Sequence, residues 1–282
     1  MASFPSPTAL AARQAVAERL KELRSEAGLT GKQLAEACGW HKAKTSRIEN
    51  AHTAPTDADI RAWCRACGAE DQVADLTAAS RNAESMYVEW RRKQRSGLRR
   101  LQASYVPLYQ RTRRFRVYTP DIVPGFVQTP GYSRALLSAI TAFREIPDDV
   151  EQAVQARQAR SQVLYESHRS FALLVEEPVL RYRVGDREVM AEQLEHLLSV
   201  MGLATVSLGV IPLSTTRRMW PLEACYIYDD RLVQVELLTA EVSVRAPGEI
   251  ATYTKAFNAL RRLAVYGEDA RALIAAAADA LE

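Results

Sequence analysis

The 282-residue chain contains little that is typical of a secreted protein or a membrane protein. Its four cysteines are too few for a disulfide framework in a chain of this size. No apolar run approaches the ~18 residues that a membrane span needs, and the start, MASFPSPTALAARQ, has no basic segment followed by an apolar one. We therefore expect a cytoplasmic protein with no signal peptide and no membrane partner.

Sequence signatures of catalysis are also missing. There is no G-x-S-x-G, no P-loop and no G-x-G-x-x-G. Glu176 and Glu177 could form a carboxylate pair for acid–base chemistry, but their position before a proline favours the start of a loop. Glu192, Glu195 and His196 do not have the H-E-x-x-H spacing and favour the solvated face of a helix. We expect no enzyme activity and no cofactor.

The cysteine spacing allows one metal hypothesis. Cys64 and Cys67 could begin a zinc site that Cys38, His41 or His52 would complete. There is no second paired motif, and a spacing of three places both thiols on one face of a helix. The pattern therefore favours core cysteines, and we expect no metal.

Charge is distributed unevenly. Residues 1–80 carry 10 basic and 10 acidic side chains, residues 81–116 carry 11 and 2, and residues 117–282 carry 16 and 22. The basic block at 91–116 has three interpretations: added phosphate contacts, a docking surface for a partner, or a solvated helix that links two domains. In the domain division we treat 81–116 as a basic helical linker.

The N-terminal part has the pattern of an all-α domain. We expect a disordered arm over 1–12 and a five-helix domain over 13–80. The first helix ends at Gly28, Thr30 and Gln33 have the spacing of a capping box for the second, and Thr56 caps a later helix. Beyond the linker, β-branched and aromatic runs alternate with amphipathic ones, which predicts an α+β domain over 117–282. Our hypothesis assigns regulation and dimerisation to this domain.

The stretch GWHKAKTSRIEN at 39–50 predicts a helix-turn-helix. Two helices that cross closely need a small residue at the crossing point, which Ala35 supplies, and a turn that accepts positive φ, which Gly39 supplies. The shared core positions are expected at Leu34, Cys38, Trp40, Thr45 and Ile48, with Thr45 the weakest match.

These residues, within LRSEAGLTGKQLAEACGWHKAKTSRIEN, resemble the phage-repressor/Cro, or xenobiotic-response-element, type of helix-turn-helix over roughly 13–70. The resemblance implies an ion pair between Arg24 and Glu49. The family usually has glutamine at the start of the second helix, where it holds a phosphate; this chain has Gly31, so Lys32 or Gln33 is expected to make that contact.

The same resemblance implies contacts with double-stranded DNA. The base-edge contacts fall on Lys42, Ala43, Ser46 and Arg47. The DNA-backbone contacts fall on Lys32, Gln33, His41, Lys44, Asn50, His52 and Thr53. It further implies a nucleoid-associated homodimer on a pseudo-palindromic operator, with repression as the expected output.

The C-terminal part also resembles a known group. TPDIVPGFVQTPGYSRALL, QARQARSQVLY, EEPVLRYRVGDREVMAEQLEHLL, VSLGVIPL and FNALRRLA are similar to the second domain of actinobacterial WhiJ-like regulators, over roughly 82–275. That resemblance implies modulation by a small protein partner or a ligand. An alternative is an antitoxin-like protein whose C-terminal domain sequesters a small partner, with DNA binding serving autoregulation.

A small-molecule effector would need a pocket in this second domain. Phe171, Trp220, Tyr226 and Tyr228 could line one. The same aromatic residues could instead belong to an ordinary sheet core, and the pattern favours the core.

Overall fold

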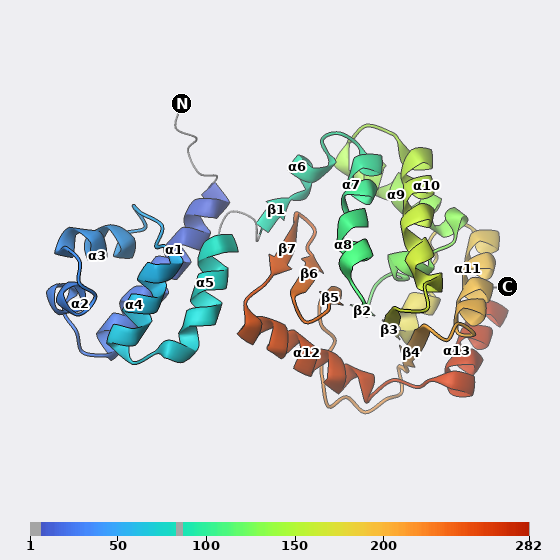
Figure 1. Cartoon of the computed structure of the whole chain (residues 1–282). Coiled ribbons are helices and arrows are strands. Elements are labelled where there is room, and N and C mark those ends of the chain that lie inside the picture. The colour runs from blue at the N-terminus through green and yellow to red at the C-terminus, as the bar shows by residue number, and fades with distance from the viewer. Residues whose placement is uncertain (1–6, 83–86, 282) are drawn as a thin grey trace. The chain divides into compact units, whose positions relative to one another are not determined.

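The computed structural model describes residues 7–82 and 87–281. The chain divides into two compact units (Figure 1). The N-terminal unit comprises the chain up to Tyr87 together with 243–251, and the C-terminal unit comprises 88–242 and 252–282. An all-α helix-turn-helix region followed by an α+β region was predicted, and this fold class is confirmed.

Five α-helices and one short 3₁₀ turn form the described part of the N-terminal unit up to Asn82. Their bounds are α1 (Pro7–Glu26), α2 (Gly31–Ala37), α3 (Lys42–Glu49), α4 (Asp57–Cys67), η1 (Glu70–Gln72) and α5 (Val73–Asn82). The capping boxes expected at Thr30 with Gln33 and at Thr56 with Asp59 are both present. Helix α1 begins at Pro7, so residues 7–12 of the expected arm are helical, and residues 1–6 lie outside the described residues. Proline suits the first turn of a helix, where its missing N–H is not needed.

The core of this unit lies between α1, α4 and the two shorter helices. It contains Leu20, Leu34, Ile48, Ile60 and Trp63, each fully buried. The Trp63 Nε1–H donates to the Leu20 carbonyl at 2.9 Å, so the one polar group of this buried indole has a hydrogen-bond acceptor. This packing fixes where α3 lies.

The remaining strands and helices build one mixed sheet and its covering layers. They are β1 (Tyr87–Glu89), α6 (Trp90–Gln94), α7 (Leu98–Ser104), α8 (Val106–Arg111), β2 (Arg114–Thr119), η2 (Gly125–Val127), α9 (Pro130–Arg144), α10 (Val150–Ser161), η3 (Gln162–Tyr165), β3 (Ser170–Glu176), η4 (Glu177–Leu180), α11 (Arg187–Val200), β4 (Val206–Ile211), β5 (Cys225–Tyr228), β6 (Leu232–Glu236), β7 (Ala240–Val244), α12 (Pro247–Arg261) and α13 (Gly267–Asp279).

The seven-stranded sheet has the order β1-β7-β6-β5-β2-β3-β4. Strands β2, β3 and β4 are parallel, with Phe115 opposite Phe171 and Leu173 opposite Leu208. One face of this half packs on α8, α11 and α13 and forms the main apolar core (Figure 1). Burial on both faces explains why β3, within the sequence FALLVEE, is a nearly continuous apolar run.

Strands β5 and β6 are antiparallel neighbours joined by a two-residue turn. Asp229 and Asp230 join the strands with φ of 53° and 63°, the left-handed geometry of a two-residue hairpin turn. The Asp229 carboxylate accepts from the backbone N–H groups of Arg113 and Arg114, and Asp230 pairs with Arg114 and Arg116. The acidic turn therefore holds the start of β2.

The basic block is not a linker helix. The segment that begins at Val88 belongs to the C-terminal unit up to Val242, and within it α6, α7, α8 and the start of β2 replace the helix expected over 81–116. Leu98, Leu101 and Tyr109 are buried between the basic residues, so the apolar positions anchor this segment in the unit. Residues 83–86 of the expected linker lie outside the described residues.

Candidate nucleic-acid interface

The turn between α2 and α3 has the geometry that the sequence predicted. Gly39 has a φ of +70°, and nothing lies within 4 Å of the position that a Cβ would take there. Its requirement for glycine is therefore conformational rather than steric. Ala35 is buried, and its carbonyl accepts from the Trp40 N–H at 3.0 Å. Together they set the angle between the two helices.

The start of α3 is capped by a histidine. The His41 Nδ1 accepts from the Ala43 N–H at 3.2 Å, in place of the usual serine or threonine oxygen. Thr45, the weakest match to the apolar pattern, is buried, and its hydroxyl accepts from the Trp40 Nε1–H at 2.9 Å. A threonine suits this core position because the half-buried indole needs a hydrogen-bond acceptor.

The ion pair expected between α1 and α3 is present. Arg24 Nε lies 2.5 Å from Glu49 Oε1, and both side chains are about 15% exposed. The same guanidinium donates from Nη1 to the Leu29 carbonyl at 2.6 Å. Glu49 is thereby tied to the end of α1, which fixes the rotation of α3 about its axis.

The face of α3 that points away from the apolar core of the N-terminal unit is open to solvent. Figure 1 shows α2 and α3 side by side, with α1 and α4 next to them and α5 on the far side of α1 and α4. All four residues expected to contact bases are exposed: Lys42, Ala43, Ser46 and Arg47. The expected backbone contacts that are also exposed are Lys32, Gln33, His41, Asn50, His52 and Thr53. These residues come from α2, from α3 and from the segments that flank α3, which are the elements that a helix-turn-helix presents to DNA.

Two of these exposed side chains also stabilise helix ends. The Asn50 Nδ2 donates to the Ser46 carbonyl at 2.7 Å, at the C-terminus of α3. The Gln33 Oε1 accepts from the Thr30 N–H at 2.9 Å in the capping box of α2. A phosphate contact from Gln33 would therefore use its amide nitrogen.

Lys44 differs from the other expected contacts. Its Nζ lies 2.6 Å from Asp59 Oδ1 and 4.6 Å from the centre of the Trp40 ring, so its charge is used within the unit. The expectation of a DNA-backbone contact is replaced by a tie between α3 and α4. Lys44 and Thr45 both contact Trp40, which precedes α3: Lys44 lies over its ring, and Thr45 accepts its indole N–H.

Asp59 has two structural roles, and the sequence indicated only one of them. Its capping role was visible in the Thr56 spacing, but its pairing with Lys44 depends on the packing of α3 against α4. Burial pushes the pKa of Asp59 upward, while the hydrogen bonds from Lys44 and Thr56 outweigh it and hold that pKa below its usual value. The carboxylate is therefore charged at neutral pH and holds Lys44 in place.

The cysteines of this unit belong to its interior. Cys64 is buried in the core, and Cys38 and Cys67 pack against it. Burial raises the pKa of Cys38 and of Cys64 to about 11. Among the residues that the structure describes, no group of three or more His, Cys, Asp or Glu side chains is placed to hold a metal ion.

The four aromatic residues suggested for an effector pocket do not form one. Phe171 stacks on Phe115 at 4.5 Å between ring centres, and Tyr228 meets the same ring edge-on at 5.8 Å. Both are core residues. Trp220 is 68% exposed, and Tyr226 is partly buried on β5. The sequence favoured the core over a pocket for these aromatic residues, and the structure places Phe171 and Tyr228 there.

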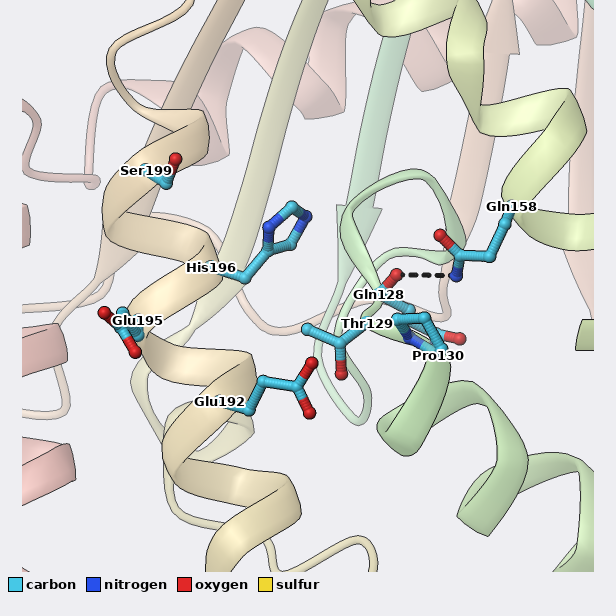
Figure 2. Close-up of a pocket in the computed structure, with 8 residues that line it drawn as sticks. All are labelled: Gln128, Thr129, Pro130, Gln158, Glu192, Glu195, His196 and Ser199. Atoms are coloured by element: carbon cyan, nitrogen blue, oxygen red, sulfur yellow. Dashed lines mark hydrogen bonds between the residues drawn. The ribbon is translucent and has the colours of Figure 1, made fainter.

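A cavity of about 310 Å³ lies elsewhere in the C-terminal unit (Figure 2). It is an open cleft lined by Gln128, Thr129, Pro130, Gln158, Glu192, Glu195, His196 and Ser199. Figure 2 shows Glu192 and His196 projecting from α11 toward the start of α9, while Glu195 points away. Burial lowers the pKa of His196, which keeps the imidazole neutral at physiological pH. Among the described residues no hydrogen bond joins the His196 imidazole to the Ser199 hydroxyl, and every lining residue except Pro130 has a polar side chain.

Comparison with protein-family models gives two matches. Residues 15–76 match the model described as Helix-turn-helix domain. With the exposed face of α3, this match places the N-terminal unit among helix-turn-helix DNA-binding proteins and indicates a DNA-binding regulator. Residues 102–276, more than half of the chain, match Domain of unknown function (DUF5753), and the chain belongs to that family. No curated protein matches the chain. None of the helices in 7–82 and 87–281 is long and apolar enough to cross a membrane.

Proposed function

We propose that this chain is a sequence-specific transcriptional repressor that binds a pseudo-palindromic operator as a two-fold dimer. The observation that carries the proposal is the exposed face of α3, which offers Lys42, Ser46 and Arg47 in the orientation that a helix-turn-helix presents to a major groove. Neither Lys42 nor Arg47 forms an ion pair with another described residue, so both side chains can bind guanine O6 and N7.

In this proposal the C-terminal unit modulates DNA binding and does no chemistry. Its resemblance to the WhiJ-like regulators supports modulation by a small protein or a ligand. A two-fold dimer would place one copy of α3 in each of the two half-sites of the operator, which doubles the number of protein–DNA contacts.

Fluorescence anisotropy with the gene's own upstream DNA tests the proposal. The full chain is compared with a Lys42→Ala/Arg47→Ala double variant across a salt series. The variant should lose specific binding and retain weak nonspecific binding, because its base contacts are removed and most phosphate contacts stay.

A matched control keeps the charge change and moves it away from α3. Lys21→Ala/Arg65→Ala removes two exposed cations from α1 and α4. This control should retain sequence preference. Equal losses in both variants, or a wild type that binds every duplex equally, would overturn the proposal.

A further inference from the structure

The polar cleft of the C-terminal unit is formed by elements that hydrogen bonds hold together. Its residues come from α11, from α10 and from the segment that leads into α9 (Figure 2). Gln193, fully buried on α11, donates from Nε2 to the Val127 carbonyl at 2.8 Å, and its Oε1 accepts from the Thr129 N–H at 2.8 Å. Gln158 donates from Nε2 to the Gln128 carbonyl at 3.0 Å. The walls of the cleft are therefore fixed in advance, which lowers the ordering cost of binding a ligand.

The cleft has the size of a site for a small molecule. Its volume of about 310 Å³ lies at the lower end of the ~300–1,000 Å³ that ligand pockets occupy. Gln128 and Thr129 are buried, whereas Glu192 and Ser199 are exposed. A ligand therefore reaches the cleft directly from solvent.

The cleft leaves strong hydrogen-bond acceptors unused. The Thr129 N–H and one N–H of Gln158 Nε2 are already bound within the unit, and Pro130 has no N–H. Within the described residues, neither the Gln158 Oε1 nor the Glu192 carboxylate accepts a hydrogen bond. A neutral His196 adds one acceptor nitrogen. These groups favour a ligand that donates hydrogen bonds.

No cation balances the charge of Glu192. None of the lining residues is a lysine or an arginine. Arg134 lies within electrostatic reach of Glu192, but Glu151 holds its guanidinium, with Nε 2.5 Å from Oε1 and Nη2 3.0 Å from Oε2. The neutral imidazole of His196, whose pKa burial lowers, supplies no charge at physiological pH. The cleft is therefore negatively charged.

The surroundings favour an organic cation over a metal ion. Residues 117–282, which include every lining residue, carry 22 acidic and 16 basic side chains, and an excess of one sign raises the local concentration of the other. No group of three or more His, Cys, Asp or Glu side chains in the described part of the chain is placed to hold a metal. A hard metal ion needs more oxygen ligands than one carboxylate supplies.

The acceptors lie on opposite sides of the cleft. Figure 2 shows Glu192 and His196 projecting from α11 and Gln158 projecting from α10 on the other side. A primary ammonium group carries one positive charge and three N–H donors. It can therefore pair with the carboxylate and still donate to an amide oxygen or an imidazole nitrogen.

We propose that this cleft binds a small organic molecule that carries a primary ammonium group. The ammonium group pairs with Glu192, its remaining N–H bonds face Gln158 Oε1 and the His196 imidazole, and the rest of the molecule lies over Thr129 and Pro130. The use of this site by a regulatory effector rests on the proposed function, whereas the binding itself does not depend on DNA.

The test is an NMR titration of the full chain labelled with ¹³C-histidine. The chain has four histidines, of which His196 lines the cleft and His168 is exposed outside it in the same unit. A His196→Gln variant assigns the resonance. Ethanolammonium chloride is the probe. Ethylene glycol replaces its ammonium with a hydroxyl group, and choline chloride keeps the charge without any N–H donor. The pH and the ionic strength are held constant.

The His196 resonance should shift saturably with ethanolammonium and stay unchanged with ethylene glycol. The His168 resonance should not follow it, because that side chain is outside the cleft. Choline should bind at least about threefold more weakly, because it brings the charge without the N–H donors.

Two variants of α11 form a matched pair. Glu192→Gln should weaken ethanolammonium binding about three- to fivefold, the loss expected for an ion pair that solvent reaches. Glu195→Gln removes the same charge from a side chain that points away (Figure 2), and should change the dissociation constant by less than about 1.5-fold. Both side chains are exposed, so both variants should fold.

Three outcomes would overturn the proposal. They are linear shifts that His196 and His168 share, which indicate nonspecific cation effects, equal losses in the two variants, and binding of choline or ethylene glycol as tight as that of ethanolammonium. Operator binding is measured in parallel. Its absence together with saturable binding at the cleft would refute the proposed function alone.

Discussion

Two lysines of α3, two residues apart, should have different roles, and this difference is the sharpest prediction of the structure. Lys42 is exposed, whereas Lys44 pairs with Asp59 at 2.6 Å and lies over the Trp40 ring. We expect Lys42→Ala to weaken specific DNA binding and leave stability unchanged. We expect Lys44→Ala to lower stability and leave the salt dependence of DNA binding unchanged.

The size of each effect follows from the contacts. A pair that is partly exposed, with Lys44 35% and Asp59 11% exposed, contributes about 0.5–1 kcal/mol, and the contact with Trp40 adds a similar amount. Lys44→Ala should therefore cost about 1–2 kcal/mol of stability. Lys42→Ala should stay within about 0.5 kcal/mol in stability, but lose about 1–3 kcal/mol of specific DNA binding.

Hydrogen exchange measured by mass spectrometry separates the two effects locally. With Lys44→Ala, amides of α3 and α4 should exchange about 5- to 30-fold faster, which is the loss of 1–2 kcal/mol expressed as a rate. Lys42→Ala is the matched control and should leave exchange unchanged. Anisotropy over a salt series supplies the binding slopes. If Lys44→Ala reduced the salt slope as much as Lys42→Ala does and left exchange unchanged, the inward placement of Lys44 would be refuted.

Three further outcomes are expected. Glu49→Gln should lower the free energy of unfolding by about 1–3 kcal/mol, measured by chemical denaturation, because Arg24 then keeps only neutral partners. The same substitution should cost less in an Arg24→Gln background, and an equal cost in both backgrounds would contradict the ion pair. Gly39→Ala should cost about 1–2 kcal/mol in the same assay because its φ is +70°; an unchanged unfolding midpoint would show that the turn relaxes. The pKa of Cys38 and Cys64 is raised to about 11, so both thiols should be alkylated at pH 8 far more slowly than in urea and faster as the pH rises toward 11. Equal rates with and without urea would contradict their burial.

Local signals carried most of the N-terminal prediction. Capping residues, a left-handed glycine and apolar residues at helical spacing all act within a few positions, so the sequence was sufficient to place α2, α3 and α4. The prediction of a linker helix for the basic block rested on its charge alone. It gave no weight to the leucines between the basic residues, which bury part of the segment in the C-terminal unit.

The sequence by itself determined the helix-turn-helix, its exposed face and the α+β character of the second unit, since those follow from short-range periodicity and turn chemistry. Only the tertiary structure decided that Lys44 points inward against Trp40 and Asp59, and that Arg157 and Arg160 are buried on α10 with neutral hydrogen-bond partners. These facts depend on residues far apart in the chain that meet across a helix pair or a sheet, and no local pattern specifies which charged side chains will find a partner there.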